Sequence, residues 1–271
     1  MPILQPKLEI PLSSADLPVP VMFRSAVSPA DGLYPHHQHA WGEFVYSFRG
    51  VMEVKLADHH YLAPPQYGIW LPPCIEHVGL NRQESHHCSL YVSPAACAAM
   101  PAEPCALTVS PLVRALLEHL RDHPPALAPS AEDGRLMHVL LDQLAHSPCT
   151  HSYLPLSNDP LLAPVLQALE TDPSDNRTLA EFALAANTTE RTLARRCERD
   201  LGMSLVEWRQ RLRVVRALPL LEAGQKVEAI AFDLGYGSAS AFIAMFKRLM
   251  GVTPDEFRRG VAVPRPTPLN Y

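Results

Sequence analysis

Two stretches in the carboxyl-terminal half decide the fold of this chain, because one repeats the other. Residues 197–209 read CERDLGMSLVEWR, and residues 246–258 read FKRLMGVTPDEFR. Both follow one pattern at an offset of 49: a hydrophobic residue, four residues, Gly, one residue, Ser or Thr, two residues, Glu, an aromatic residue and Arg. Upstream, Ala183 corresponds to Ala231 at an offset of 48. Each copy is typical of a helix, a short polar turn and a second helix, so the sequence predicts two helix-turn-helix units.

The ends of these helices are marked in the sequence. Thr178 with Glu181, and Ser204 with Glu207, have the spacing of capping boxes, in which the hydroxyl and the carboxylate bind free amides of the first turn. Thr253 precedes a proline at the first helical position. Three glycines follow helical runs and predict left-handed C-caps: Gly202, Gly224 and Gly251.

Charge divides the chain into two chemically different halves. Residues 1–150 carry 8 Lys and Arg against 14 Asp and Glu, whereas residues 151–271 carry 15 against 14. All 13 histidines lie at or before His151. The contrast predicts two domains. Eight arginines lie between positions 191 and 216: Arg191, Arg195, Arg196, Arg199, Arg209, Arg211, Arg213 and Arg216.

The second unit carries a family signature. Residues 230–254 contain IAFDLGYGSASAF, then FKR and GVTP. This segment resembles the DNA-binding domain of the AraC/XylS family of bacterial transcription regulators, and the resemblance covers residues 160–260. It implies a seven-helix module with recognition helices near 189–200 and 238–249. Recognition helices about one DNA turn apart, roughly 34 Å, can read successive major grooves.

The resemblance also implies which residues contact DNA. An arginine can bond guanine O6 and N7 together, worth about 1–3 kcal/mol of discrimination, whereas a small side chain offers a methyl contact or one hydroxyl bond. We expect Arg199 and Arg209 to pair with nearby acids instead. The base contacts are expected from Arg191, Thr192 and Arg195 in the first unit and from Ala239, Ser240, Ala241 and Ala244 in the second. The phosphate contacts are expected from Arg196, Lys247 and Arg248.

Three positions depart from the family pattern. Asn187 and Cys197 stand where a glycine and a phenylalanine are common. Pro219 falls late in the helix that joins the two units, where a proline is expected to kink or shorten it. We expect the fold to persist and the angle between the two units to be affected.

The sequence of the amino-terminal half predicts β-structure. Between residues 21 and 93, short apolar runs alternate with turn residues, and prolines at 64–65 and 72–73 bound strands because they cannot lie in central ones. This pattern predicts a small antiparallel barrel or sandwich. Apolar residues then recur at helical spacing between 112 and 146, which predicts two amphipathic helices that pack on the barrel or on another subunit.

A set of histidines and one glutamate lies inside the expected barrel. His37 and His39 are two apart and point to the same face if they lie on one strand, and Glu43 keeps the same parity. His77 on a second strand can supply a fourth ligand. Three imidazoles and one carboxylate suit a single divalent transition metal, Zn, Ni, Fe, Mn or Cu, and ligand softness alone does not choose among them. The open alternative is that these histidines line a pocket for an organic effector or bond one another.

Residues 32–81 resemble the two characteristic motifs of the cupin superfamily, with Cys74 where a glycine is usual. The resemblance implies a jelly-roll barrel around a central pocket, with His37, His39, Glu43 and His77 as the metal positions. Two other histidine pairs, at 59–60 and 86–87, are interpreted as turn and surface residues. Aromatic residues are candidate pocket walls or core: Trp41, Tyr46, Phe48, Trp70 and Tyr91.

The fold class expected is therefore α+β with two domains: a cupin-type antiparallel β-barrel with helices, followed by an all-α tandem helix-turn-helix. Because no apolar run is long enough to cross a membrane and the first residues lack the layout of a signal peptide, we expect a cytoplasmic protein without membrane contact. The six cysteines form no CxxC pair, which excludes a zinc ribbon. The domains expected are a sensor barrel at 1–104 with its core at 21–93, packing or dimerisation helices at 105–146, a linker at 147–159, the DNA-binding domain at 160–260 and a tail at 261–271.

These observations predict a sequence-specific, DNA-binding transcription regulator, and not an enzyme, whose barrel senses a metal ion or a small-molecule effector. The expected partners are double-stranded DNA, the unknown effector, a second copy of the chain through residues 112–146, and RNA polymerase if the protein is an activator. The alternative is a metal-dependent cupin enzyme of the dioxygenase or isomerase type with an attached DNA-binding domain. A site of three histidines and one glutamate can keep open coordination positions, so the pocket alone does not decide between them.

Overall fold

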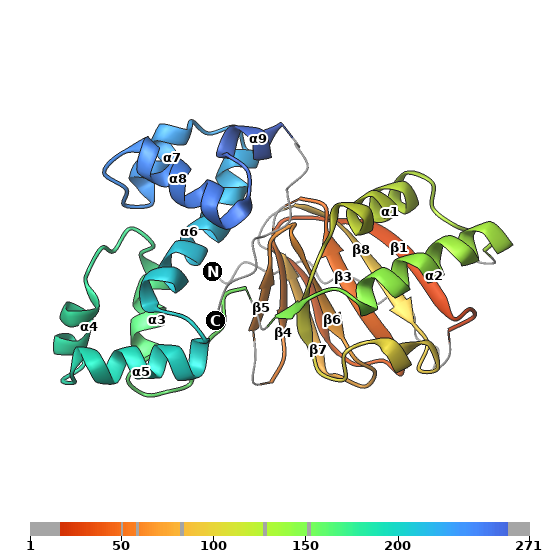
Figure 1. The fold of residues 1–271 in the computed structure, drawn as a ribbon, viewed down its shortest axis with the longest axis horizontal. Helices are drawn as coiled ribbons and strands as arrows, with labels where there is room; N and C mark the ends of the chain where they lie inside the picture. The colour runs from red at the N-terminus through yellow and green to blue at the C-terminus, as the bar shows by residue number, and fades with distance from the viewer. Residues whose placement is uncertain are drawn as a thin grey trace, which may run out of the picture. The chain divides into compact units, whose positions relative to one another are not determined.

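The computed structural model describes residues 17–49, 51–57, 60–81, 84–126, 129–150 and 153–259. The chain divides into two compact units between Tyr153 and Leu154. This division falls inside the predicted linker 147–159. The predicted tail 261–271 lies outside the described residues. Figure 1 shows a first unit dominated by strands and a second made of helices, so the predicted α+β fold with two domains is confirmed.

The first unit contains two antiparallel sheets in its described residues. The larger has the strand order β1-β8-β3-β6-β9-β10, and the smaller has the order β2-β7-β4-β5. Apart from β4 and β5, neighbouring strands in the sheets are far apart in sequence, as in a jelly roll. The strands are β1 Val21–Ser28, β2 Gly32–His37, β3 Gly42–Ser47, β4 Met52–Lys55, β5 His60–Ala63, β6 Tyr67–Leu71, β7 His77–Asn81, β8 Ser85–Val92, β9 Cys105–Thr108 and β10 Cys149–Thr150.

The barrel extends further along the chain than the predicted boundary at residue 104. Residues 105–108 form β9, which pairs with β6, and Cys149–Thr150 form β10, which pairs with β9. Part of the predicted linker is therefore an edge strand of the larger sheet. A short 3-10 helix at Ala96–Ala99 precedes β9, and the helices α1 Pro111–Asp122 and α2 Ala131–Ala145 lie between β9 and β10 in the chain.

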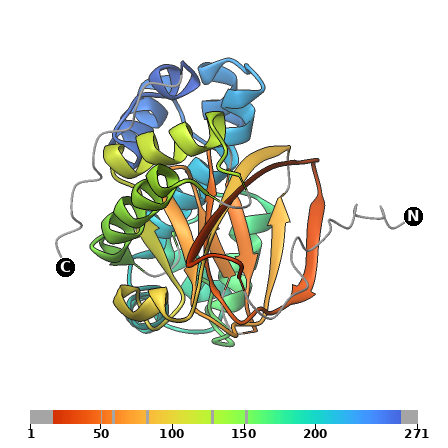
Figure 2. The same cartoon turned by 90° about the vertical axis from the view of Figure 1, so that its right-hand side faces the viewer.

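Helices α1 and α2 cover the outer face of the larger sheet, as Figures 1 and 2 show. Alternate residues of β3 and β8 point to that face, because successive side chains in a strand point to opposite sides. Phe44 and Tyr46 of β3 pack there against Leu117 and Leu140 of the helices. The expectation that these helices pack on the barrel is confirmed for this face. Tyr46, Phe48 and Trp70 belong to the same core and are not pocket walls.

In the described residues of the second unit, 154–259, the regular elements are all helices, joined by loops. Its predicted end signals mostly form as expected: Thr178 and Thr253 make complete capping boxes, and Gly202 and Gly251 adopt left-handed C-caps. Ser204 caps its helix, but the carboxylate of Glu207 accepts a hydrogen bond from Arg211 at 2.7 Å and does not complete a box. The seven helices are α3 Ala163–Thr171, α4 Leu179–Ala185, α5 Glu190–Leu201, α6 Leu205–Glu222, α7 Val227–Asp233, α8 Ala239–Met250 and α9 Pro254–Arg258.

The internal repeat is visible in the backbone of the two turns. Asn187 has φ 50° and Gly235, 48 positions later, has φ 77°. In each copy, the amide of the next residue donates to the carbonyl of the corresponding alanine, Ala183 or Ala231, at 2.9 Å. Helix α6, which joins the copies, continues past Pro219 to Glu222. No helix of the described residues is long and apolar enough to cross a membrane.

Candidate functional sites: the barrel cavity and the paired recognition helices

The two sheets enclose a cavity of about 660 Å³, part of it open to solvent. Its inner wall is made by the residues of β3 and β8 that alternate with those packed against the helices, such as Glu43, Val45, Ser89 and Tyr91. The wall is therefore a direct product of the period-two pattern of the strands. The lining residues are Arg24, Tyr34, His37, His39, Trp41, Glu43, Val45, Met52, Val54, His77, Gly79, Leu80, Asn81, Ser85, His87, Ser89 and Tyr91.

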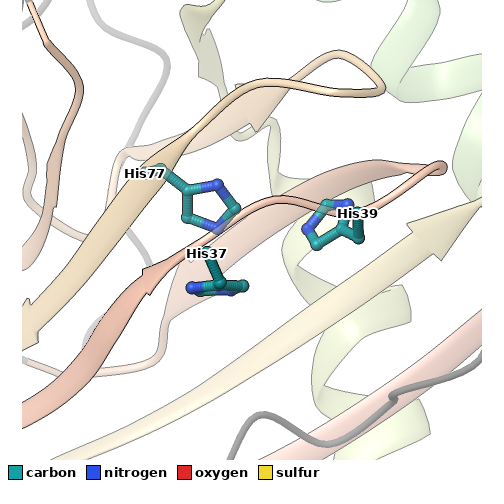
Figure 3. A group of neighbouring side chains, drawn as sticks. All are labelled: His37, His39 and His77. Atoms are coloured by element: carbon teal, nitrogen blue, oxygen red, sulfur yellow. The ribbon is translucent and has the colours of Figure 1, made fainter.

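The cavity brings together three of the predicted metal residues, His37, His39 and His77. One ligand atom from each lies within 4.8 Å of the others, and the ring centroids of His37 and His77 are 4.2 Å apart (Figure 3). The reason differs from the expected one. His37 ends β2 in the smaller sheet, and His39 lies in the connection to β3 in the larger sheet, so a turn and not strand parity makes them converge.

A backbone hydrogen bond ties the two histidine-bearing segments to each other. The amide of Cys74 donates to the carbonyl of His39 at 2.8 Å, three residues before His77. Cys74 has φ 65°, a left-handed conformation that glycine adopts more easily. The turn therefore forms with cysteine in place of the usual glycine, although a left-handed conformation is unfavourable for a residue with a side chain.

All three histidines present the same ring nitrogen to the cavity. Each Nδ1–H donates to the carbonyl of a residue two positions away: His37 to Pro35 at 2.7 Å, His39 to Trp41 at 2.7 Å and His77 to Ile75 at 2.9 Å. A carbonyl only accepts, so Nδ1 carries the proton and, in the neutral ring, Nε2 carries the lone pair. Such a bond orients a metal-binding imidazole and makes it more basic.

Glu43 completes this group from the larger sheet. Its Oε2 lies 3.1 Å from Nε2 of His39 and 3.5 Å from Nε2 of His77, and the carboxylate is 9% exposed. Burial alone would raise the pKa of Glu43, but hydrogen bonds from His39 and His77 outweigh it and hold the pKa well below its usual range. Burial lowers the pKa of His77, but the contact with Glu43 more than reverses this and raises it.

The surroundings of His37 favour its neutral form. Burial and the nearby ring of His77 lower its pKa. In this group of three histidines and Glu43, a carboxylate anion faces imidazole nitrogens. Either protons on two of the rings or a bound metal ion can supply the positive charge that lies between them. Three imidazole nitrogens and a carboxylate oxygen are a donor set that divalent transition metals accept, so the residues present fit such an ion.

The cavity also contains polar residues that the sequence analysis missed or misplaced. His87 lies in β8 and is buried, and burial lowers its pKa to about 4. Its neighbour His86 points to the other side and contacts the hydroxyl of Ser25 at 3.3 Å. The interpretation of this pair as turn and surface residues was wrong, because two adjacent residues of a buried strand always place one side chain inward. His60 is also buried, 2.7 Å from Glu53, and His59 lies outside the described residues.

In the second unit, α5 and α8 have the bounds and caps expected of the two recognition helices. Thr189 and Ser238 cap them through their side chains, at 3.2 and 3.3 Å. Leu193 and Cys197 of α5 occupy the buried stripe that Phe242 and Phe246 occupy in α8. The smaller Cys197 thus serves as a core residue at the position where phenylalanine is common.

The residues predicted to contact bases lie on the outer faces of these helices. Arg191 and Arg195 are exposed, Thr192 is half-buried, and no hydrogen bond or ion pair to either arginine occurs among residues 153–259. Thr192 accepts or donates a hydroxyl bond with Thr189 at 2.9 Å. The corresponding face of α8 is small and weakly polar, as the sequence indicates: Ala239 is half-buried, and Ser240, Ala241 and Ala244 are exposed.

The three residues predicted to contact phosphates differ in how free they are. Lys247 and Arg248 are exposed at the end of α8, where Arg248 donates to Gln210 at 2.5 Å. Arg196 forms an ion pair with Asp159, which also accepts from Arg199 at 2.9 Å. The phosphate contact of Arg196 stays a prediction. A DNA phosphate would compete with Asp159 for the guanidinium of Arg196.

Several arginines of the 191–216 group hold the second unit together. Arg213 is 4% exposed; it donates to the carbonyl of Pro173 at 2.8 Å and to Asn176 Oδ1 at 2.9 Å, and it lies over the ring of Tyr236. Arg209 donates to the carbonyls of Asp175 and Arg177, at 3.2 and 2.8 Å. The expected pairing of Arg209 with an acid is thus replaced by bonds to backbone oxygens.

These bonds connect the first helix-turn-helix directly to the second. The loop 172–177, which leads into α4, meets the turn between α7 and α8, where Asn176 donates to the carbonyl of Gly235 at 2.7 Å. A Cβ added at Gly235 would overlap the carbonyl oxygen of Ser174 and lie 2.9 Å from its Cα. We call this contact of Ser174, Asn176, Arg213, Gly235 and Tyr236 the clasp. The clasp holds the two helix-turn-helix copies side by side, in addition to their connection through α6.

Comparisons with known proteins agree with both halves of this geometry. A family model for an AraC-like ligand-binding domain matches residues 19–152, and one for a helix-turn-helix domain matches residues 182–260. The transcriptional regulator NimR of Escherichia coli (strain K12) is 32% identical over 223 residues, 82% of this chain and 81% of NimR. A putative AraC-like transcription regulator of Streptomyces lividans is 33% identical over 171 residues, 61% of this chain and 56% of that protein.

Solved structures of similar layout are more distant. ToxT from Vibrio cholerae is 13% identical, with 88% of this chain and 98% of ToxT covered and a TM-score of 0.38. The DNA-binding domain of AdpA, solved in complex with a target DNA, is 28% identical, with 38% of this chain and 92% of that chain covered and a TM-score of 0.35. At these TM-scores the superpositions carry no weight for the site, which rests on the residues described above.

Proposed function

Because the chain belongs to the AraC family of DNA-binding transcription regulators, we propose that its barrel senses a divalent transition metal, or a small molecule bound at that metal. The observation that carries the proposal is the convergence of three imidazole nitrogens on one buried carboxylate. His37, His39 and His77 each turn Nε2 inward, and Glu43 Oε2 lies 3.1 and 3.5 Å from two of them.

The electrostatics of this group support a cation at its centre. Glu43 is buried and accepts from rings whose other nitrogen is already committed to a backbone carbonyl. A buried anion needs a compensating positive charge, which a divalent metal supplies without requiring that two neighbouring imidazoles be protonated together. A bound metal would act there as a Lewis acid with open positions for an effector. Zn, Ni, Fe, Mn and Cu all accept this donor set, so direct measurement has to choose among them.

The output of the regulator is DNA reading, and we assign its main base contacts to α5. Arg191 and Arg195 are exposed, lack partners among the described residues of their unit and lie one helical turn apart. Either can form a bidentate contact with guanine in the major groove. Helix α8, with Ser240 and the three alanines beside it, is expected to specify less, while Lys247 and Arg248 add salt-dependent phosphate affinity.

A second copy of the chain is the partner we propose for α1 and α2. Most of their apolar residues are buried against the barrel, but Leu112 and Val139 are 50% and 46% exposed. Dimerisation through these helices, a contact with RNA polymerase and the coupling of barrel to DNA all belong to the proposal. Couplings of this kind are typically about 1–3 kcal/mol, which changes DNA affinity several-fold.

The test is elemental analysis of protein purified without chelator, combined with DNA-binding measurements on metal-loaded and chelator-treated protein. The wild type should hold one metal ion per chain and lose it in the double variant His37→Ala, His77→Ala. The control variant is His138→Ala with His146→Ala, on the exposed side of α2, which should keep the metal. Equal operator affinity with and without metal would remove the sensing role.

A turnover screen on the metal-loaded protein addresses the enzymatic alternative. A bound metal without dioxygenase or isomerase turnover supports a sensor. Wild-type protein that contains no metal and takes none up would show that the four residues do not form a metal site, and it would leave the assignment of the DNA-binding unit unaffected.

A further inference from the structure

The two helix-turn-helix copies are joined along the chain by one helix that contains a proline. Helix α6 is 18 residues long, follows α5 and precedes α7, and Pro219 lies inside it (Figure 1). Because proline has no backbone N–H, residue 219 cannot donate the helical hydrogen bond to the carbonyl of Val215, four positions earlier. Helices bend most readily at such positions. Helix α6 by itself therefore leaves the angle between the two copies adjustable.

The clasp is a second connection, and it starts from the same helix. Arg213 lies on α6 before the proline, is buried, and donates to the carbonyl of Pro173 and to Asn176 Oδ1 at 2.8 and 2.9 Å. Its guanidinium carbon also lies 4.9 Å from the ring centroid of Tyr236. One buried side chain thus joins the loop that leads into α4 to the turn that leads into α8.

Both ends of the clasp lie next to helices of the two copies. Asn176 comes two residues before Thr178, the N-cap of α4, and α4 packs against the recognition helix α5. Tyr236 comes two residues before Ser238, the N-cap of α8, and its ring lies 5.6 Å from the ring of Phe242 on α8. A movement at either end of the clasp is therefore passed directly to a recognition helix or to the helix packed on it.

At Gly235 the two copies approach each other to backbone contact. Asn176 Nδ2 donates to the carbonyl of Gly235 at 2.7 Å. A Cβ at this position would overlap the carbonyl oxygen of Ser174, so no side chain fits between the loop and the turn. Backbone atoms cannot move away by a change of rotamer, so this contact is stiffer than one between long side chains. Because the contact lies to the side of α6, it opposes rotation of one copy relative to the other about that helix.

Duplex DNA is sensitive to the distance and the angle between two recognition helices. One base pair inserted between two major-groove elements moves the second element by about 3.4 Å and turns it by about 34° around the duplex axis. A protein with a flexible joint between its two reading units can follow this movement, whereas a protein with a rigid joint loses the contacts of one unit. The stiffness of the joint therefore decides which separations of the two elements a regulator accepts.

We propose that the clasp is a specificity determinant: by holding α5 and α8 at one distance and angle, it restricts the protein to operators whose two major-groove elements have one separation. Arg213, Asn176 and Gly235 act as positioning residues, because they lie on α6, in the loop 172–177 and in the turn before α8, and not on the recognition helices. The inference rests on the assignment of α5 and α8 as the recognition helices and adds the spacing of the operator to it.

The experiment is a selection of binding sites by the full chain from duplexes with about 25 randomised base pairs, enough for two grooves about one turn apart. Metal-loaded and chelator-treated protein are used in parallel, so that the result does not depend on which state of the barrel binds DNA. Sequencing should show two enriched elements at a single separation. Adding or removing one base pair between these elements should weaken wild-type binding about tenfold, the loss expected from one wrong base pair.

Three variants test the residues of the clasp. Asn176→Ala removes an exposed side chain with its bonds to Arg213 and to the carbonyl of Gly235, and Gly235→Ala forces the loop and the turn apart. Both variants should bind the lengthened and shortened duplexes within about threefold of the selected duplex, because a joint that moves avoids the loss. Arg213→Lys keeps a positive charge beside Tyr236 and should keep part of the wild-type preference. If Gly235→Ala does not fold, Asn176→Ala decides.

Gly202→Ala is the matched control for a loss of stability. Gly202 also has a left-handed conformation, with φ 65°, but a Cβ there would meet nothing within 4 Å. This variant should keep the wild-type preference for one separation even though its Tm is lower. A preference that is lost equally in Gly202→Ala and Gly235→Ala would reflect stability alone, and the clasp would have no role in specificity.

The remaining outcomes separate this inference from the assignment of the recognition helices. Wild-type protein that accepts several separations, or an unchanged preference in Asn176→Ala and Gly235→Ala, would overturn the role of the clasp and leave both recognition helices in place. Enrichment of one element or of none would contradict the assignment of α5 and α8 as a reading pair, and the inference about the clasp would fail with it.

Discussion

Replacing Gly235 by alanine should loosen the second unit by breaking the clasp. Gly235 has φ 77°, and a Cβ there would overlap the carbonyl oxygen of Ser174 and lie 2.9 Å from its Cα. A left-handed conformation costs a non-glycine residue about 1–2 kcal/mol. The overlap involves backbone atoms that cannot rotate away, so relief requires the loop 172–177 to move, at a cost of about 1–3 kcal/mol for overpacking. That movement also stretches the bond from Asn176, worth about 1 kcal/mol.

The total destabilisation expected for Gly235→Ala is therefore about 3–6 kcal/mol. Two glycines of the same unit provide matched controls. Gly202 and Gly224 have φ 65° and 78°, and a Cβ at either meets nothing within 4 Å. Their alanine variants carry the conformational cost alone, about 1–2 kcal/mol. The difference between Gly235→Ala and these controls isolates the contact between the two helix-turn-helix units.

Thermal unfolding of the full chain, followed by circular dichroism at the helical band, measures this difference. For a domain of this size, about 1 kcal/mol shifts the Tm by several degrees, so Gly235→Ala should melt about 10 °C or more below the Gly202→Ala variant. Binding to operator DNA should weaken in parallel, because the distance between the recognition helices is no longer held. If both variants melt together within a few degrees, the clasp contributes nothing in solution and the reasoning fails.

Three further outcomes follow from single residues. Arg191→Ala or Arg195→Ala should each cost about 1–3 kcal/mol of specific DNA affinity in a fluorescence anisotropy titration, with helical content unchanged. Arg196→Ala should cost less, because Asp159 already forms an ion pair with that side chain. An equal loss of affinity in all three variants would contradict the assignment of the base contacts. Cys74→Gly should raise the melting temperature, because it removes a side chain from a residue with a left-handed backbone conformation, which costs about 1 kcal/mol. An unchanged or lower melting temperature would show that the thiol has a packing role. Burial raises the pKa of Asp159, but its hydrogen bonds with backbone amides and arginines outweigh burial and lower the pKa to about 2. The free energy of unfolding that this carboxylate contributes is fully present above its unfolded-state pKa of about 3.9 and is lost as the pH falls through about 2. Asp159→Asn should therefore weaken the loss of stability at acid pH, and a stability–pH curve with an unchanged acid side would refute the pairing.

The helix-turn-helix repeat was predictable because its determinants are local. Caps, C-terminal glycines and one apolar stripe act within a few residues of each other, so they can be read directly from the chain. The bounds of α5 and α8 differ from the expected 189–200 and 238–249 by one residue. The turn at Asn187 is also a local feature, because asparagine is one of the few residues besides glycine that adopt a left-handed conformation.

The cationic face of the second unit was harder to predict. A run of eight arginines indicates a DNA-binding surface, yet Arg209 and Arg213 bond backbone carbonyls inside the unit, and Arg196 and Arg199 pair with Asp159. Whether an arginine faces solvent depends on which carbonyls lie near it after folding, and those come from a loop more than 30 residues earlier in the chain. Charge counting therefore identifies the function of the unit without identifying which arginines perform it.

Sequence spacing alone determined that this chain pairs a histidine-bearing barrel with two helix-turn-helix units, because strand alternation, helix periodicity and capping are short-range. Only the tertiary structure decided how the groups meet. Glu43 and His37 come from different sheets and converge through a turn, and Arg24 and His87 become part of the cavity because β1 and β8 pair across 60 or so residues of chain. Such meetings depend on which strands become neighbours, and that choice is made by the burial of the whole core and not by any one segment.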